Sequence, residues 1–402
     1  MNQQRRFTRS WPCLVCALCC VSLAQAVEPA AAADELRISG GPYLQAPSPR
    51  SMTLVWTTNR KCTSKVEYGL SADRLTETVR AAQHGLVDAN TTLHRVIVNG
   101  LRPGTKYYYR VTSTEILEFK PYKVKYGPSV QKEGYFTTLD PAKERFSFCV
   151  INDRHDRAAE LRQALASIDW EGVDLVIALG DVMNDPMSET QIFEKFINPC
   201  VEAFASRIPL VLVRGNHETR GLMARSLMEY FPTASGRFYY SFVHGGVHFL
   251  LLDGGEDKAD TSPEYSGLAA FDDYLAEQTD WLRRELQSQN FADARFRICL
   301  LHIPPAVDAR EDEKKFIRSP WIRNHWSPLL GQAGIDLMLS GHTHRYTELP
   351  ADEDRAYPLV IGGTDTVIRV DVSPEQLRLA TFKNDGTLLS RPPDVPARKP
   401  AK

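Results

Sequence analysis

Two patterns of hydrophobic and polar positions divide the chain near residue 140. Before it, short stretches alternate hydrophobic and polar residues and are separated by Gly, Pro, Asn and Asp; they are Met52–Trp56, Lys65–Tyr68, His94–Val98 and Tyr107–Val111. A period of two with turn residues between the stretches is typical of half-buried antiparallel strands. We therefore predict an all-β sandwich over residues 35–140.

After residue 140 the pattern changes to buried strands alternating with amphipathic helices. Apolar stretches of strand length cover residues 146–151, 173–179, 208–213, 297–301 and 335–339, and helical stretches cover residues 158–168, 190–204 and 281–286. This alternation predicts an α/β domain over residues 145–385. Gly245 and Gly246, between two further apolar stretches, predict a hairpin. The tail 391–402, dense in Pro, Arg and Lys, is predicted to be disordered.

The first 26 residues have the pattern of an export signal. Three arginines precede an apolar run over residues 11–23 and the small-residue sequence Ala24-Gln25-Ala26. Such a series is typical of a secretory signal peptide, so we expect cleavage after Ala26 and a secreted or periplasmic protein without a transmembrane segment. A signal anchor is the alternative, although the apolar run is shorter than the ~20 residues of a membrane helix.

Composition and cysteine content narrow the class of protein. The chain has 402 residues, 43% of them hydrophobic and 24% charged, which favours two globular domains. A formal net charge of -2 gives no broad attraction to nucleic acid or to an anionic membrane. Four scattered cysteines remain after signal removal, and we expect buried free thiols, with one disulfide as the alternative; they are Cys62, Cys149, Cys200 and Cys299.

Polar residues suited to metal chemistry follow five of the predicted strands. The five stretches hold half of the ten histidines; they are Asp153-Arg-His155, Gly180-Asp181, Gly215-Asn216-His217-Glu218, His302 and Gly341-His342-Thr-His344. Strand ends are where open α/β sheets place ligands. Oxygen and nitrogen donors of this kind suit Fe, Mn or Zn, and their number suits two ions that share Asp181 as a bridge. His217 would then face the centre without being a ligand.

Each stretch alone has a simpler explanation. Gly180-Asp181 could be a junction between a strand and a turn, Asn216 could cap a helix, and His302 could be a hydrogen-bonded loop residue. The occurrence of all five at strand ends is harder to explain structurally, because buried polar groups need partners. The combination therefore favours a metal site.

These five stretches resemble, in order and spacing, the motifs of the calcineurin-like metallophosphoesterases. The resemblance covers about residues 145–385 and implies an αββα sandwich with two metal ions. It implies His217 as the proton donor. It also implies two ligand groups: Asp153, His155, Asp181 and His344 around one ion, and Asp181, Asn216, His302 and His342 around the other.

The N-terminal segment strengthens the resemblance. Trp56 fits a core tryptophan, and Leu101–Tyr107 resembles the turn and tyrosine corner of fibronectin type III domains. A fibronectin III-like sandwich before the phosphoesterase domain resembles the purple acid phosphatases. Those enzymes have a tyrosine three residues after the bridging aspartate, where this chain has Asn184. We therefore expect His155 to replace the phenolate ligand and the protein to be colourless.

The sequence thus predicts a secreted enzyme that hydrolyses small phosphate esters with a metal-bridging hydroxide. A phosphomonoesterase is favoured, and a phosphodiesterase acting on nucleotides or phospholipids is the alternative. A secreted carbohydrate- or surface-binding protein with a vestigial metal site is the rival from another class. Candidates for binding phosphate are Arg154, Arg214, Arg220 and Arg345. The segments 254–273 and 307–328 could line the site. The oligomeric state is not predicted.

Overall fold

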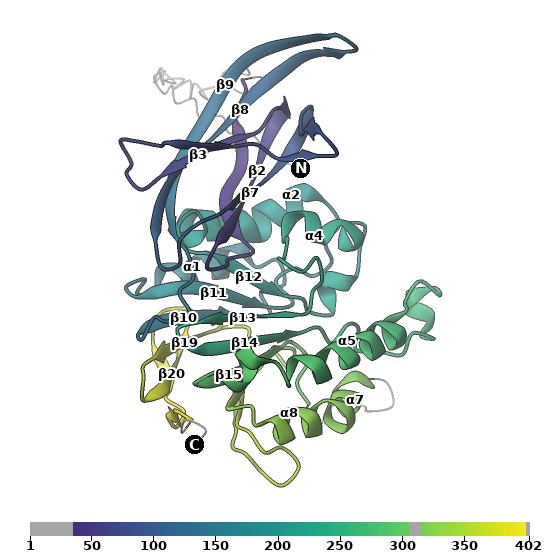
Figure 1. The fold of residues 1–402 in the computed structure, drawn as a ribbon. Coiled ribbons are helices and arrows are strands. Elements are labelled where there is room, and N and C mark those ends of the chain that lie inside the picture. Colours follow the sequence, from purple (N-terminus) through teal and green to yellow (C-terminus); the bar gives the residue numbers. More distant parts are fainter. Residues whose placement is uncertain (1–34, 306–315, 399–402) are drawn as a thin grey trace, which may run out of the picture. The chain divides into compact units, whose positions relative to one another are not determined.

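Seven strands of the N-terminal part form two layers of antiparallel sheet (Figure 1). The computed structural model describes residues 35–305 and 316–398, so the predicted signal peptide lies outside the described part. Strand pairing joins the two layers where Cys62 of β2 lies opposite Glu115 of β8. One layer contains β1 (Ile38–Gln45), β2 (Ser51–Cys62) and β7 (Thr91–Asn99); the other contains β3 (Lys65–Gly69), β4 (Glu77–Val79), β8 (Lys106–Lys120) and β9 (Lys123–Thr137).

Trp56 and Tyr107 are buried in the core between these layers, as the sequence predicted for Trp56. Trp56 is fully buried, and its Nε1 donates to Ser113 Oγ at 2.9 Å. The Tyr107 hydroxyl accepts a hydrogen bond from the backbone nitrogen of Arg102 at 3.0 Å, which closes the turn before β8. A separate small hairpin joins β5 (Ala82–Gln83) to β6 (Leu86–Val87).

Two mixed sheets build the α/β part. The first has the order β12-β11-β10-β19-β20-β21, with β22 also paired to β20, and the second has the order β13-β14-β15-β16-β18-β17. Strands of the first sheet are β10 (Phe146–Ile151), β11 (Val173–Leu179), β12 (Leu210–Val213), β19 (Thr366–Val372), β20 (Gln376–Lys383), β21 (Leu388–Ser390) and β22 (Val395–Pro396). Strands of the second are β13 (Tyr240–His244), β14 (Val247–Leu252), β15 (Phe296–Leu301), β16 (Leu337–Ser340), β17 (Thr347–Leu349) and β18 (Leu359–Ile361).

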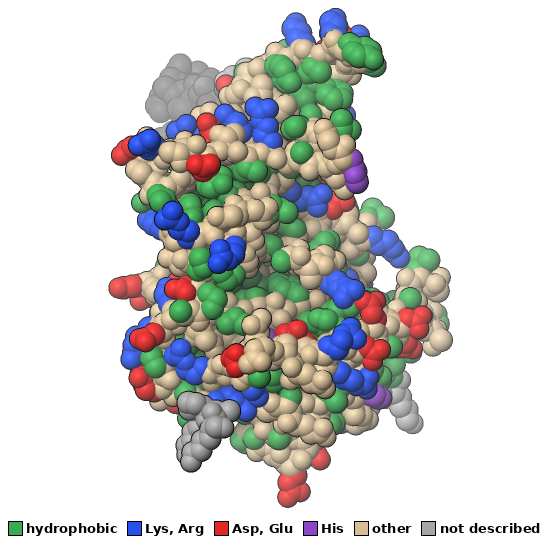
Figure 2. Space-filling view, viewed as in Figure 1, with side chains coloured by type: hydrophobic (Ala, Val, Ile, Leu, Met, Phe, Trp, Pro, Cys, Tyr) green, Lys and Arg blue, Asp and Glu red, His purple; other side chains and the backbone are tan. Residues whose placement is uncertain are grey.

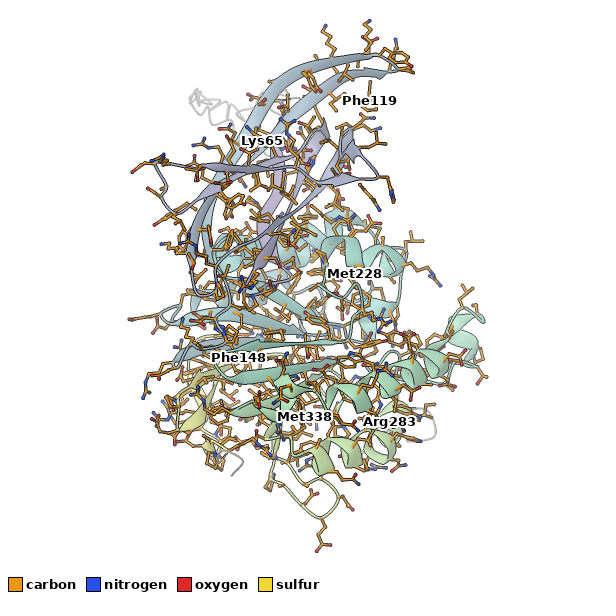
Figure 3. The ribbon with its side chains drawn as sticks, viewed as in Figure 1. Lys65, Phe119, Phe148, Met228, Arg283 and Met338 are labelled. Carbon is orange, nitrogen blue, oxygen red and sulfur yellow. The ribbon has the colours of Figure 1, made fainter. Side chains whose placement is uncertain are left out.

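The inner faces of the two sheets pack on each other. Phe148 of the first sheet meets Phe249 of the second edge-to-face, with ring centroids 5.2 Å apart (Figure 3). Every residue of β10 is buried, as expected for a strand covered on both faces. This arrangement explains why the sequence shows continuous apolar stretches rather than alternation.

Helices cover the outer faces of both sheets (Figure 1). Helices α1 (Ala158–Ala166), α2 (Glu189–Ile192) and α3 (Asn198–Cys200) pack on the first sheet, and α5 (Phe271–Glu285), α7 (Arg318–His325) and α8 (Ser327–Ala333) pack on the second. Two further short helices are α4 (Leu227–Tyr230) and α6 (Gln289–Ala292). Four layers result, as the resemblance to the metallophosphoesterases implied.

The sandwich and the α/β part share contacts and belong to one compact unit that begins at residue 36. The Tyr43 hydroxyl donates to the carbonyl oxygen of Tyr230 at 2.8 Å, and the Tyr109 hydroxyl donates to that of Ser206 at the same distance. Tyr43 also meets Phe193 edge-to-face. Strand β1 of the sandwich therefore helps to bury the helices that cover the outer face of the sheet containing β10.

Other expectations from the sequence have mixed outcomes. Among the described residues the four cysteines are buried and free, which confirms the interpretation as thiols. His244 and His248 are buried and pair with Asp174 and Glu285, so they are packing residues.

The prediction of disorder is wrong for residues 391–398, because β22 pairs with β20. Within the described ranges no helix has the length and apolar character to cross a bilayer.

Candidate metal centre

The predicted ligands meet where the carboxyl ends of both sheets come together. Three ligand stretches follow β10, β11 and β12 of the first sheet, and two follow β15 and β16 of the second. Within each group the strands are parallel, so their carboxyl ends lie on the same edge. Five predicted ligands have positive φ angles between 44° and 73°: Asp153, His155, Asp181, His342 and His344.

Left-handed backbone at five non-glycine residues is costly and clusters at functional sites. Two glycines make the surrounding turns possible. A Cβ on Gly180, whose φ is +80°, would collide with the imidazole of His302, and a Cβ on Gly215 would collide with the carboxylate of Asp181. The sequence therefore positions the ligands through strained turns at strand ends.

The first group of ligand atoms surrounds the carboxylate of Asp153. Asp153 Oδ1 lies 3.6 Å from His155 Nε2 and 3.5 Å from His344 Nε2. The two histidine nitrogens are 3.0 Å apart. Asp181 completes the group, with Oδ2 3.9 Å from His155 Nε2. One atom from each of these four residues lies within 4.8 Å of all the others, which is the spacing needed to hold one ion.

A second group shares Asp181. Its Oδ2 lies 3.1 Å from His302 Nε2, and Asp181, His302 and His342 also offer atoms within 4.8 Å of one another. Asn216 Oδ1 lies 3.1 Å from His342 Nδ1 and brings an amide oxygen to the same place. The structure therefore brings together all seven side chains that the sequence singled out as ligands.

Two of the predicted ligands, Asp153 and His302, use one side-chain atom for hydrogen bonds and keep the other without a hydrogen-bond partner among the described residues. Asp153 Oδ2 accepts from Asn152 Nδ2 at 2.6 Å and from the His342 backbone nitrogen at 2.9 Å, whereas Oδ1 is buried without a partner among the described residues. His302 Nδ1 donates to the Leu179 carbonyl at 2.8 Å, and its Nε2 is likewise buried without a hydrogen bond in the described ranges. Ligand atoms oriented in this way, by partners on their other atoms, fit a metal ion.

The electrostatics of the buried pair also favour a cation. Burial alone would raise the pKa of Asp181, but the imidazole of His302 outweighs it and holds this pKa well below its usual range. Burial alone would lower the pKa of His302, but the Asp181 carboxylate raises it. The buried carboxylates of Asp153 and Asp181 therefore need positive charge nearby. A metal ion supplies this charge and leaves His302 without an added proton.

Glu218 is a positioning residue that the sequence reasoning left without a role. It is fully buried and accepts hydrogen bonds from the backbone nitrogens of Asp181, Gly215 and Met183 at 2.7, 2.9 and 3.1 Å. Burial, followed by the charge of Asp181, raises the pKa of Glu218 to about 7. Its place directly after Asn216-His217 was the only signal that could have found it.

His217 lies beside both groups without belonging to either. Its backbone nitrogen donates to Asp181 Oδ1 at 3.0 Å, and its Nε2 is 3.9 Å from Asp181 Oδ2. Nδ1 donates to the carbonyl of Asn184 at 2.6 Å. The backbone carbonyl of Asn184 therefore orients the histidine. Arg220 Nη1 donates to Nε2 at 3.2 Å.

The four candidate arginines have different surroundings. Arg154 is buried and donates to the carbonyls of Thr364 and Thr366, so its proposed role in binding substrate is wrong. Arg214 pairs with buried Asp253 at 2.6 Å. Arg220 pairs with Glu256 and remains next to His217. Arg345 is exposed and follows His344 directly.

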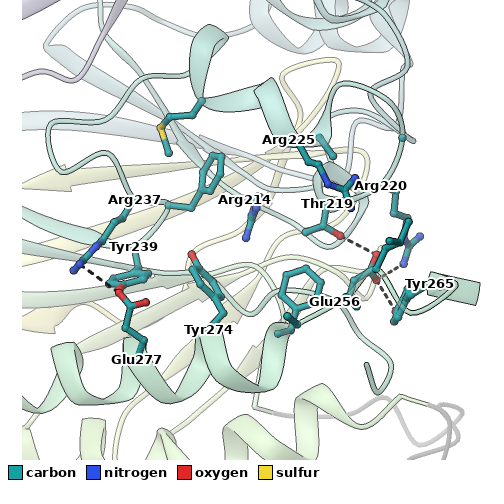
Figure 4. A pocket seen from close by; sticks show the side chains of 18 of the residues that line it. Arg214, Thr219, Arg220, Arg225, Arg237, Tyr239, Glu256, Tyr265, Tyr274 and Glu277 are labelled. Atoms are coloured by element: carbon teal, nitrogen blue, oxygen red, sulfur yellow. Dashed lines mark hydrogen bonds and ion pairs between the residues drawn. The ribbon is translucent and has the colours of Figure 1, made fainter. Parts of the chain in front are cut away.

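A cavity of about 740 Å³ opens beside Arg220 (Figure 4). Its walls combine aromatic rings and guanidinium groups, including Arg214, Arg220, Phe238, Tyr239, Phe271 and Tyr274. Segment 254–273 contributes to this wall, and its Asp257 Oδ2 lies 3.5 Å from Asn216 Nδ2. Part of segment 307–328 lies outside the described residues, but Arg318 Nε donates to the Glu256 carbonyl.

Comparisons with known proteins agree with this geometry. The calcineurin-like phosphoesterase family matches residues 146–346, half of the chain, and the purple acid phosphatase N-terminal domain matches residues 41–138. The chain therefore belongs to the calcineurin-like phosphoesterase family. It combines this domain with an N-terminal segment that matches the N-terminal domain of purple acid phosphatases.

Individual relatives are distant. Purple acid phosphatase 23 of Arabidopsis thaliana is 23% identical over 296 residues, which are 64% of this chain and 57% of the relative. Serine/threonine-protein phosphatase CPPED1 of Homo sapiens is 30% identical over 140 residues, covering 34% of this chain and 42% of that protein. The structure of purple acid phosphatase PPD1 from yellow lupin has a TM-score of 0.64 at 16% identity, covering 87% of this chain and 73% of that one.

Proposed function

We propose that this protein is a secreted phosphomonoesterase with a dinuclear metal centre. The observation that carries the proposal is the sharing of Asp181 between two groups of ligand atoms, each compact enough for one ion. The first ion would be held by Asp153, His155, Asp181 and His344. The second would be held by Asp181, Asn216, His302 and His342. When bound, two such ions supply Lewis-acid chemistry, because they neutralise phosphoryl oxygens and lower the pKa of water.

His217 is the residue that would protonate the leaving group. Its Nδ1 is held by the Asn184 carbonyl, so Nε2 is the nitrogen that faces the ligands and can carry the transferred proton. Arg220 donates to this same nitrogen. Proton donation therefore requires Arg220 to turn away, toward Glu256 or toward the phosphate of the substrate.

The cavity beside Arg220 gives the leaving group a place. Because Arg220 lies between His217 and the cavity, an ester whose leaving oxygen is near His217 would extend its remaining atoms along the aromatic wall. Phosphodiesters on nucleotides or phospholipids remain the alternative substrates, because the same cavity would accept a second ester group.

Three further assignments belong to this proposal. The three-plus-four arrangement of antiparallel strands and the bond between Tyr107 and Arg102 support a fibronectin III-like identity of the sandwich. We place the two domains at residues 35–140 and 145–385. The strands of the sandwich span residues 38–137, and those of the α/β part begin at Phe146 but continue through β22 to Pro396, past residue 385. The N-terminal pattern supports export through cleavage after Ala26.

The experiment is hydrolysis of two nitrophenyl esters, a phosphate monoester and a phosphate diester, by the mature protein reconstituted with Mn, Fe or Zn. A strong preference for the monoester supports the proposal, and a preference for the diester replaces it with the phosphodiesterase. Two bound metal equivalents without turnover of either ester would contradict both. Absence of bound metal together with binding to polysaccharide would favour the surface-binding protein.

A further inference from the structure

The far end of the β8–β9 hairpin exposes a group of large hydrophobic side chains. Five of the fifteen exposed large hydrophobic residues of the described chain lie within ten positions, with exposed fractions from 41% to 109%: Leu117, Phe119, Tyr122, Val124 and Tyr126. Figure 2 shows hydrophobic side chains (green) beside basic ones (blue) at this end of the molecule, and Figure 3 labels Phe119 there. We call these five residues the apolar tip.

The hairpin carries its apolar tip away from the core. Strand β8 pairs with β3 through residues 108–112 and with β2 at Glu115, and β9 pairs with β8 alone. From residue 116 to residue 126 the ribbon is therefore two-stranded in the described structure and projects past the other strands (Figure 1). A free two-stranded ribbon gains nothing from apolar residues that no other element covers.

The two faces of the ribbon differ in chemistry. Phe119 pairs directly with Val124, and Tyr126 is on the same face as Val124 because side chains alternate along a strand. The opposite face carries Lys120 and Lys123, which are also a direct pair. The ribbon is therefore apolar on one face and cationic on the other.

The charge of the tip is positive although the whole chain is near neutral. Between residues 117 and 126 there are three lysines and one glutamate, which leaves a net charge of +2. The glutamate, Glu118, pairs with Lys120 at 2.7 Å and with Lys123 at 2.8 Å. Tyr122 occupies the apex of the turn and is fully exposed.

We propose that the apolar tip docks the protein on an anionic lipid bilayer. Aromatic side chains beside lysines suit the interface of a membrane, where rings enter the boundary of the acyl chains and ammonium groups meet anionic headgroups. Pairing with a second copy through β9, the edge strand of the ribbon, is disfavoured, because this strand carries Lys123 and Lys125 and pairing would bring the lysines of the two copies close together. The apolar tip contains none of the candidate metal ligands, so docking is separate from the chemistry of the metal centre.

The experiment is flotation of the mature, full protein with vesicles of phosphatidylcholine, with and without phosphatidylglycerol. We expect the protein to float with the anionic vesicles, less with pure phosphatidylcholine, and less again at high salt. Replacing Phe119→Ser and Tyr122→Ser together weakens partition by about tenfold or more, because two buried rings are lost. Replacing Lys120→Gln and Lys123→Gln weakens it by a similar factor on anionic vesicles only.

Leu86→Ser is the matched control, since Leu86 is 75% exposed on another hairpin. It should float like the unchanged protein, and all variants should retain hydrolysis of a soluble nitrophenyl ester. The proposal is overturned if the unchanged protein does not float, if both tip variants float normally, or if the control loses as much. It is also overturned if the tip substitutions leave flotation unchanged but change the particle mass of the protein measured without lipid. That result would identify a second copy of the chain as the occupant of the tip.

Discussion

His155 and His344 bring their Nε2 atoms to 3.0 Å from each other, although 189 positions separate them in the chain. Two protonated imidazoles could not stay this close without strong repulsion. Both residues also have left-handed backbone, with φ of 44° and 60°. The fold thus holds two imidazole nitrogens close together beside the carboxylate of Asp153, on strained backbone. A cation bound by both nitrogens is the simplest way to stabilise this arrangement.

Replacing Asp181→Asn should remove both metal ions, because Asp181 is the only residue common to the two groups. We expect metal content to fall to a small fraction and turnover to fall by more than about a hundredfold. Elemental analysis after gel filtration measures the first effect, and ester hydrolysis measures the second. Asp185→Asn, in the same loop, is the control; equal metal loss in both variants would contradict the role of Asp181.

The variant His217→Ala should retain its metal but lose turnover by about 10²–10⁴-fold. The loss should be largest for alkyl phosphates, whose leaving oxygen needs a proton, and smallest for nitrophenyl phosphate, whose leaving group departs as an anion. Comparison of kcat for the two substrates tests this difference. An equal loss for both would show that His217 acts by positioning and not as the proton donor.

Glu218→Gln should disturb the turns that hold Asp181 and Gly215. The carboxylate accepts three backbone hydrogen bonds, and the amide of glutamine would place a donor against one of these backbone nitrogens. We expect a loss of about 1.5–3 kcal/mol in the free energy of unfolding and metal binding weakened by about 10–100-fold. Urea titration and metal competition with a chelator measure the two effects. Wild-type metal affinity in the variant would refute the positioning role.

Glu285 makes the stability of the protein depend on pH. The hydrogen bond from His248 lowers the pKa of Glu285 more than burial raises it. A lowered pKa in the folded state means that the stabilisation is present above the unfolded-state pKa and is lost as the pH falls through the folded-state pKa.

We therefore expect Glu285→Gln to cost about 1–2 kcal/mol at neutral pH and progressively less in acid. Thermal unfolding at a series of pH values measures the difference from the unchanged protein. Asp280→Asn, which removes only an exposed ion pair with Arg283 on the same helix, should change stability little. A difference that does not shrink on acidification would contradict the assignment.

The four buried cysteines should be unreactive in the native protein. Burial raises the pKa of the Cys149 thiol to about 12, and it raises the pKa of Cys200 and Cys299 as well. Because the thiolate is the reactive form, a thiol reagent should label none of them until the protein unfolds, when all four react. Rapid labelling of one cysteine in the folded protein would show an opening that the structure does not contain.

The positions of the candidate metal ligands could be predicted because they depend on the local order of apolar and polar residues along the chain. An apolar strand followed by Asp153, Asp181 or His302 places a polar group at a strand end, and parallel strands bring such ends to one edge. The role of Arg154 could not be predicted in this way. It follows the first ligand directly, but its guanidinium turns into the protein to meet the carbonyls of Thr364 and Thr366, which come from a distant segment.

The sequence by itself determined the two kinds of domain, the main strands and helices, and the set of candidate ligand residues, because hydrophobic periodicity and strand-end chemistry are local properties. Tertiary structure alone decided which atoms face the centre, that Glu218 holds the turns after β11 and β12 through three backbone nitrogens, and that the Asn184 carbonyl orients His217. It also paired residues 395–396 with β20, although their composition suggested disorder. These outcomes depend on contacts between segments far apart in the chain, and no local pattern of residues encodes such contacts.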